Sequence, residues 1–140
     1  MKPRVAFFDF TCCEGCQLQM ANFGETLLDI LKLVDIVTFR EVMSERSEEY
    51  DIAIIEGSIT TEHDVERIKK IREKAKVVIA YGSCATIGGI NGMKDKFDLD
   101  EIKKYVYKDG AKYFSTIPTR AVHQVIKVDY FINNCPVYPP

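Results

Sequence analysis

The chemistry of this chain centres on four of its five cysteines. Cys13 and Cys16 form a C-x-x-C pair with a glycine inside it, and Cys84 and Cys135 stand alone far downstream. Each of these stretches follows an apolar run that is typical of a buried β-strand. Parallel neighbouring strands end at one edge of a sheet, where ligands bind in such folds. The sequence therefore predicts that four thiolates converge at one point.

Two inorganic groups suit four thiolates, namely a zinc ion and a [4Fe-4S] cluster. Structural zinc usually draws on two C-x-x-C pairs, whereas this chain has one pair and two distant cysteines. That scatter favours a larger cofactor across a sheet edge, and a Cys-Pro step such as Cys135-Pro136 recurs in iron–sulfur sites. We predict one [4Fe-4S] cluster and a role in electron transfer. A zinc-binding scaffold module without redox function is the alternative of another class. The predicted ligands are Cys13, Cys16, Cys84 and Cys135.

Simpler interpretations of the cysteines stay open. A free cysteine is commonly a small buried hydrophobe. Cys13 and Cys16 could also form a thioredoxin-like dithiol, although that leaves Cys84 and Cys135 unexplained. We expect Cys12 to be a bystander, because adjacent residues point apart and a cube has four protein ligands.

Strands and helices that alternate along the chain must position these loops. Apolar runs predict strands over 5–10, 34–39, 51–55, 76–80 and 125–132. Helical periodicity predicts a helix over 17–33, which Gly24 weakens, and two further helices. One begins at a cap on residue 60 or 61 and runs to about 74, and the other begins at residue 98 or 100 and runs to about 108. A polar connection with room for a short helix covers 41–50, and a glycine-rich loop covers 88–92. The alternation predicts an α/β fold with a parallel sheet, in one domain over residues 1–140.

Composition and charge narrow the function classes. The chain is 46% hydrophobic and 29% charged, as in ordinary soluble globular proteins. A net charge of −2 with scattered basic residues argues against nucleic acid or an anionic membrane as partner. Neither a membrane-spanning run nor a signal-peptide pattern is recognisable, so we expect a cytoplasmic location. Clustered cysteines in that reducing compartment are more often metal-binding than disulfide-bonded.

Carboxylates and histidines near the predicted edge are weaker candidates. Glu56 ends a central strand and could relay protons, or it could simply lie at a helix N-terminus or in a loop. Glu14 lies between two predicted ligands and could also relay protons, although a solvated loop carboxylate is the simpler interpretation. We expect His63 on the surface and His123 at the surface or at an interface.

Four segments together carry a family resemblance. Residues 11–19, 56–59, 82–89 and 135–136 resemble, in order, the small subunit of [NiFe] hydrogenases, a family related to the 20 kDa iron–sulfur subunit of respiratory complex I. The EGCQLQ continuation looks most like the delta subunit of archaeal cytoplasmic sulfhydrogenases. The resemblance implies a flavodoxin-like doubly wound sheet that carries the proximal cluster. It also implies a large-subunit partner with a nickel–iron centre, and further electron-transfer subunits.

The chain departs from the family pattern at three places. Asn134 replaces the usual glycine before the last cysteine, but asparagine tolerates left-handed backbone. Cys12 stands where the family more often has a serine or a carboxylate. Many relatives continue into a second cluster domain beyond the point where this sequence stops, so a fragment or a minimal one-cluster form is expected. A complex I-like or membrane-bound hydrogenase assembly is the second functional expectation.

The predicted partner would cover the cysteine edge. Residues 11–19, 57–61 and 87–93 flank that edge and are rich in small and apolar residues. An exposed patch of this kind marks an interface. We therefore expect a large subunit to cap the edge through these loops.

Overall fold

The computed structural model describes residues 1–138 and forms one five-stranded sheet in which all the strands are parallel. The strands are β1 (Arg4–Asp9), β2 (Asp35–Thr38), β3 (Ile52–Glu56), β4 (Val77–Tyr81) and β5 (Tyr130–Ile132). Their order, β2-β1-β3-β4-β5, is the flavodoxin-like order of doubly wound folds. The prediction of an α/β fold of this type is confirmed. Pro139 and Pro140, the end of the predicted domain, lie outside the described residues.

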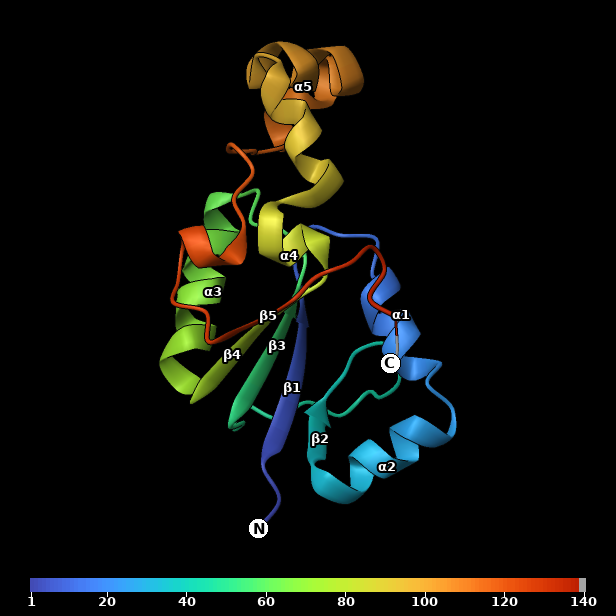
Figure 1. The fold of residues 1–140 in the computed structure, drawn as a ribbon. Coiled ribbons are helices and arrows are strands. Elements are labelled where there is room, and N and C mark those ends of the chain that lie inside the picture. The colour runs from blue at the N-terminus through green and yellow to red at the C-terminus, as the bar shows by residue number, and fades with distance from the viewer. Residues whose placement is uncertain (139–140) are drawn as a thin grey trace.

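Helices cover both faces of the sheet. The α-helices are α1 (Gly15–Ala21), α2 (Glu25–Leu33), α3 (Glu62–Lys74), α4 (Ser83–Ile87) and α5 (Leu99–Tyr107). Three 3₁₀-helices complete the set: η1 (Gly89–Lys96), η2 (Lys108–Tyr113) and η3 (Val122–Gln124). Figure 1 shows α3 on one face and α1 with α2 on the other. None of the helices within residues 1–138 combines the length and the apolar character that crossing a bilayer requires.

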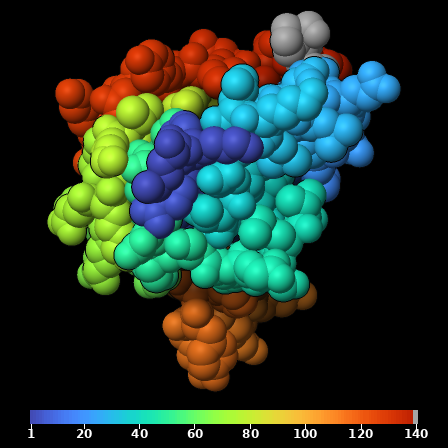
Figure 2. All heavy atoms as spheres, turned by 90° about the horizontal axis from the view of Figure 1, so that it is seen from below, coloured from blue at the N-terminus to red at the C-terminus, as the bar shows by residue number. Residues whose placement is uncertain are grey.

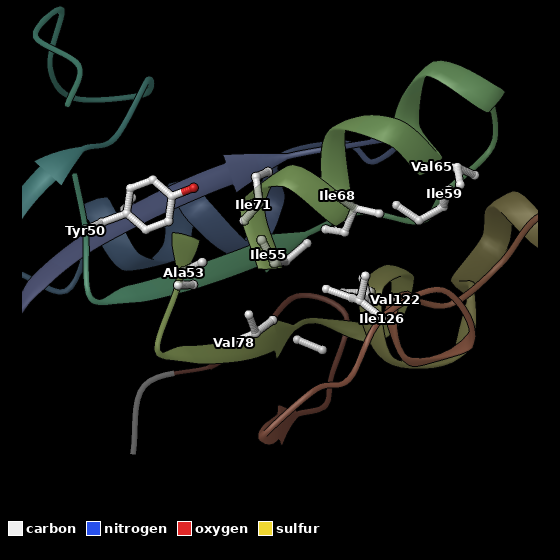
Figure 3. Packing of buried hydrophobic residues seen from close by; sticks show 14 residues of the cluster. Tyr50, Ala53, Ile55, Ile59, Val65, Ile68, Ile71, Val78, Val122 and Ile126 are labelled. Carbon is white, nitrogen blue, oxygen red and sulfur yellow. The ribbon is translucent and has the colours of Figure 1, made fainter. Parts of the chain in front are cut away.

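The main hydrophobic core lies between α3 and the sheet. Ile68 and Ile71 of α3 reach down onto Ile55 and Val78 of the central strands (Figure 3). The helix begins at Thr61, whose side chain accepts a hydrogen bond from the N–H of Asp64 while the Asp64 carboxylate accepts from the N–H of Thr61. Such a capping box satisfies N–H groups that the first helical turn leaves free. Of the two predicted caps at residues 60 and 61, Thr61 is the one observed.

Two predicted elements are wrong in extent. The helix expected over 17–33 is broken into α1 and α2, because Gly24 adopts a φ of 56° and ψ of −127° that only glycine reaches easily. The strand expected over 125–132 is reduced to β5. Val122 and Ile126 both enter the core four residues apart, which suits the turn of η3 rather than the alternation of a strand.

Two predicted connections also differ. Residues 41–50, described in full, form turns and a bridge between Thr38 and Arg46 instead of a short helix. The glycine-rich stretch 88–92 runs directly into η1 rather than forming an open loop. With α5 and η2, η1 makes a helical arm over residues 89–113, which projects from the body of the molecule (Figures 1 and 2).

Candidate functional site

The loops after β1, β4 and β5 meet at the carboxyl edge of the sheet. The N–H of Gly82 donates to the carbonyl of Ile132 over 2.8 Å, and the N–H of Ser83 donates to the carbonyl of Asn134 over 2.9 Å. A Cβ at Gly15 would lie 4.0 Å from the Cβ of Pro136, so the first and last cysteine loops are also in contact. The expectation that the three loops share one edge is confirmed.

The four predicted ligand cysteines differ in exposure. Cys16, in the first turn of α1, is buried, and Cys84, in α4, is half-buried. Cys13 and Cys135 lie in loops and are exposed. The site therefore has a buried side formed by helix residues and an open side formed by loop residues.

Glycines stand directly against the cysteine sulfurs. A Cβ at Gly82 would lie 2.5 Å from the Sγ of Cys16, and one at Gly89 would lie 2.9 Å from the Sγ of Cys84. Both glycines also have a positive φ, 88° and 58°. A larger residue at either position would displace the sulfur and strain the backbone. Each of these two sulfurs therefore packs directly against glycine backbone.

The thiols are close enough to influence one another electrostatically. Burial raises the pKa of Cys16 to about 11, and the charges of Glu56 and Cys135 add to the effect. Burial is also the main cause that raises the pKa of Cys84, and the charges of Cys135 and Cys13 raise it as smaller causes. A group that brought positive charge between these sulfurs would favour their thiolate forms, because an opposite charge nearby stabilises the charged state.

Backbone and side-chain bonds brace the first cysteine loop. Thr11 pairs with Ser58 through N–H···O bonds of 3.1 and 2.9 Å. The side-chain amide of Asn91 donates to the carbonyl of Thr11 over 2.7 Å and to Ser58 Oγ over 2.9 Å. Asn91 was not among the predicted site residues, and its position in a glycine-rich stretch was the one signal of a close approach. It ties the start of the arm to the start of the cysteine loop.

The Glu56 carboxylate binds the first turn of α1. Glu56 is 2% exposed, and its two carboxylate oxygens accept the N–H groups of Cys16 and Gln17, each over 3.0 Å. The alternative of a carboxylate at a helix N-terminus is therefore the one observed. Tyr81 is paired with Glu56 in the sheet. Burial raises the pKa of Tyr81 to about 12, and the negative charges of Cys16 and Glu56 raise it further as smaller causes. Sequence reasoning missed Gln17 and Tyr81, which have the pattern of ordinary helix and strand residues.

Glu14 has a different environment. Its residue has a φ of 61° just before α1, and its carboxylate forms an ion pair with Arg40, which lies 3.3 Å from Asp9 as well. A hydrogen bond with Glu14 is the main cause that raises the pKa of Glu41. Glu14 and Glu56 thus both have structural partners, and their role in proton relay stays a prediction.

The remaining candidates lie where the sequence suggested. His63 is exposed in the first turn of α3, and His123 is exposed on η3 with its ring against Phe131. The Cys12 thiol donates to the carbonyl of Phe10 over 3.5 Å, and burial raises its pKa to about 12. Asn134 adopts a φ of 115°, so asparagine does take the backbone conformation usual for glycine at this turn.

The thiols are not arranged as ligands of one ion. Within residues 1–138, no three His, Cys, Asp or Glu side chains come together closely enough to hold a single metal ion. One zinc ion takes all its thiolates at about 2.3 Å, whereas a four-iron cube takes its thiolates on separate irons.

A family model matches most of the chain. The model for the NADH ubiquinone oxidoreductase 20 kDa subunit matches residues 13–140. This match includes all four predicted ligand cysteines.

Curated relatives are hydrogenase subunits. The chain is 33% identical to one of the subunits of the F420-non-reducing hydrogenase (vhu) of Methanocaldococcus jannaschii, over 97% of this chain and 52% of that protein. It is 30% identical to the delta subunit of sulfhydrogenase 2 of Pyrococcus furiosus, over 95% of this chain and 56% of that protein. The chain spans about half the length of the curated relatives it matches.

A solved structure shares the fold. It is a NAD+-reducing [NiFe]-hydrogenase in the H2-reduced state, and one of its chains matches with a TM-score of 0.83 at 23% identity. The match covers 97% of this chain and 84% of that chain, so the arm belongs to the shared fold.

Proposed function

The chain belongs to the family of the NADH ubiquinone oxidoreductase 20 kDa subunit, and from that membership we propose that it is the electron-transfer small subunit of a [NiFe] hydrogenase. In this proposal the chain binds one proximal [4Fe-4S] cluster, which exchanges electrons with the nickel–iron centre of a large subunit. The direction of flow is hydrogen oxidation or proton reduction. The ligands are Cys13, Cys16, Cys84 and Cys135.

The glycines against the sulfurs of Cys16 and Cys84 are the observation that carries the proposal. Two residues without side chains, both with positive φ, let sulfurs from different strand ends pack where a Cβ would otherwise lie. A side chain at either position would push a predicted ligand sulfur out of place, so the two glycines fix where these thiols lie at the shared edge. A bound cluster would supply one-electron transfer, while the chain holds it in place and Cys16 on its buried side excludes water.

The cysteine edge also presents apolar side chains to solvent. Leu18, Ile87, Ile90 and Met93 are all exposed there, within or beside the loops predicted to contact a large subunit. Exposed apolar side chains beside a predicted site favour a protein interface there. We place the complex in the cytoplasm, where free thiols are kept reduced.

A complex I-like or membrane-bound hydrogenase assembly is the second candidate. The name of the matching family favours it, whereas the names of the relatives at 30% identity or more favour a hydrogenase. The partner decides between them. A large subunit that keeps C-x-x-C pairs at both ends for nickel and iron identifies a hydrogenase.

Metal analysis after anaerobic purification tests the cluster. We expect about four iron atoms and four acid-labile sulfides per chain. Serine at Cys13, Cys16, Cys84 or Cys135 should damage the electron paramagnetic resonance signal of the reduced cluster. Cys12→Ser is the matched control and should leave that signal intact. Stoichiometric zinc without sulfide, in protein never exposed to air, would refute the proposal.

Co-expression tests the partner. The isolated chain should be poorly soluble or lose its cluster, and a hydrogenase large subunit should restore both properties through an interface above about 2,000 Å². Ile90→Ser should weaken the complex, whereas Tyr130→Ser, at an exposed aromatic position on β5, should not. A monomeric chain that keeps its cluster in air contradicts this part of the proposal.

A further inference from the structure

Two buried side chains have polar atoms without any partner. Within residues 1–138, unpartnered buried side-chain nitrogen or oxygen atoms occur only in Gln17, at both amide atoms, and in Tyr81, at the hydroxyl. The two residues are 1% and 2% exposed. A buried polar group without a hydrogen bond is destabilising, and leucine or phenylalanine would fill the same space without that cost. A fold that keeps both groups calls for an acceptor that binds them in the working protein.

Both residues adjoin Cys16. Gln17 follows it in α1, and the N–H groups of the two residues share the Glu56 carboxylate. Tyr81 packs against Cys16 and Val137 in one buried cluster. Tyr81 also pairs with Glu56 across β3 and β4, and paired residues of neighbouring strands lie on the same face of a sheet. Gln17 and Tyr81 therefore both adjoin Cys16 and Glu56, one from α1 and one from the sheet.

Two acceptors of this region are the Glu56 carboxylate and the sulfur of Cys16. Each oxygen of the Glu56 carboxylate already accepts a backbone N–H, and neither Gln17 nor Tyr81 donates to it from its side chain. A bound cluster would make the sulfur of Cys16 a stronger acceptor, because that residue would then be a thiolate. The amide N–H of Gln17 and the hydroxyl of Tyr81 are both donors, which suits an electron-rich sulfur.

We propose that Gln17 and Tyr81 donate hydrogen bonds to the Cys16 side of the bound cluster and raise its reduction potential. The inference rests on the proposed function, since it needs a cluster on Cys16. Hydrogen bonds to the sulfurs of an iron–sulfur centre are among the interactions that set its potential. They stabilise the reduced form more, because that form carries more negative charge on the sulfurs. Gln17 and Tyr81 are positioning residues here, and the electron itself passes through the cluster.

Potentiometric titration of the complex with its large subunit tests the proposal. Tyr81→Phe and Gln17→Leu remove the donors and keep side chains of similar size. At a fixed solution potential, the ratio of oxidised to reduced cluster should rise about tenfold in each variant, which is 59 mV for a one-electron couple. Tyr50→Phe is the matched control, because Tyr50 is also buried but lies just before β3, in the α3 core. It should not change the ratio.

The other outcomes are also decisive. An unchanged ratio in both variants, with or without a change in thermal stability, overturns the proposal and leaves the pair as an internal polar contact or a water site. Loss of the cluster from both variants, with the fold and the Tyr50→Phe control intact, also overturns it, because the pair would then hold the cluster rather than adjust it. If the unsubstituted complex lacks iron and sulfide, the proposed function itself has failed, which iron analysis reveals before any titration.

Discussion

The two faces of the sheet carry hydrophobic cores of different size. On the face covered by α3, a single core joins Ala6, Ile55 and Val78 of the sheet to Ile68 and Ile71 of the helix, all of them buried. On the face covered by α1 and α2, the buried apolar residues form two smaller clusters, one of Val5, Phe7 and Phe39 and one of Cys16, Tyr81 and Val137. Every residue of α2 is at least partly exposed, and Leu28 and Leu33 are 60% and 71% exposed.

The unusual polar groups lie on the thinly packed face. Cys16, Gln17, Glu56 and Tyr81 all belong to the α1 side, where the Glu56 carboxylate rather than an apolar core ties the helix to the sheet. Of the other predicted ligands, Cys84 lies in α4, where its neighbour Ala85 packs into the α3 core. The comparison teaches that the α3 face holds the larger apolar core while the α1 face holds Cys16 and its polar neighbours, so substitutions on the two faces should have separable effects.

The largest difference should come from shortening one apolar side chain on each face. Ile68→Ala removes a fully buried side chain of α3 and should lower the free energy of unfolding by about 2–5 kcal/mol. Leu28→Ala on the exposed side of α2 should cost well under about 1 kcal/mol, since Leu28 is 60% exposed. Urea unfolding of the metal-free chain at low concentration measures both. Equal losses would mean that α2 is packed as firmly as α3, and the contrast between the faces would be wrong.

The next effect concerns the anchor of α1. Glu56→Gln replaces one carboxylate oxygen by an NH2 group, which cannot accept the N–H of Cys16 or Gln17. A buried hydrogen bond to a charged group is lost, at a cost of about 2 kcal/mol. Amide hydrogen exchange should show faster exchange in α1, with α3 unchanged. Uniformly faster exchange in both helices would place Glu56 in the general stability of the fold instead.

Parallel strands, their order of appearance and the shared edge could all be predicted from the sequence, because apolar runs with turn residues between them leave few alternatives. The start of α3 was also predictable, since Thr61 and Asp64 carry their own capping signal. The break at Gly24 was not, because a glycine in a helical pattern can either be tolerated or end the helix, and packing against the sheet decides which.

The site was predictable where residue type alone implies chemistry. Four cysteines after strands point to one edge, but nothing in the sequence says that Gly82 and Gly89 touch two of the sulfurs. The polar pair of Gln17 and Tyr81 could not be predicted either, because burial of both residues depends on how α1 sits against β4. Hydrophobic periodicity reports on local structure and does not reveal contacts between elements that are distant in the chain.

A smaller effect tests the helix starts on the two faces. Thr61→Ala removes the side-chain acceptor of the capping box of α3 and should cost about 1 kcal/mol. Thr26→Ala, at an exposed position early in α2, should be neutral or slightly stabilising, because alanine is the better helix former. Urea midpoints of the two variants give the comparison. A loss at Thr26 as large as that at Thr61 would contradict it.

The smallest effect should be the pH dependence of the tie between α3 and the sheet. Asp129 accepts the N–H of Val78 over 2.8 Å and pairs with Arg72 over 2.7 Å. The Val78 N–H and then the Arg72 guanidinium lower the pKa of Asp129 from its ordinary value. A lowered carboxyl pKa contributes stability that is present above the unfolded pKa of about 3.9 and is lost as pH falls through the folded pKa.

Asp129→Asn should therefore be less stable than the unsubstituted chain at pH 7, and the two should converge as the pH drops below about 4. Asp29→Asn on α2 is the matched control, since Asp29 pairs with Lys32 and both side chains are largely exposed. Screening by water leaves such a pair with little effect on stability, so that variant should match the unsubstituted chain at every pH. Urea midpoints between pH 7 and pH 3 measure both differences. Acid removes the charge of Asp129 and leaves its shape. If the difference in stability between Asp129→Asn and the unsubstituted chain persists unchanged at pH 3, the shape of Asp129 rather than its charge ties α3 to the sheet.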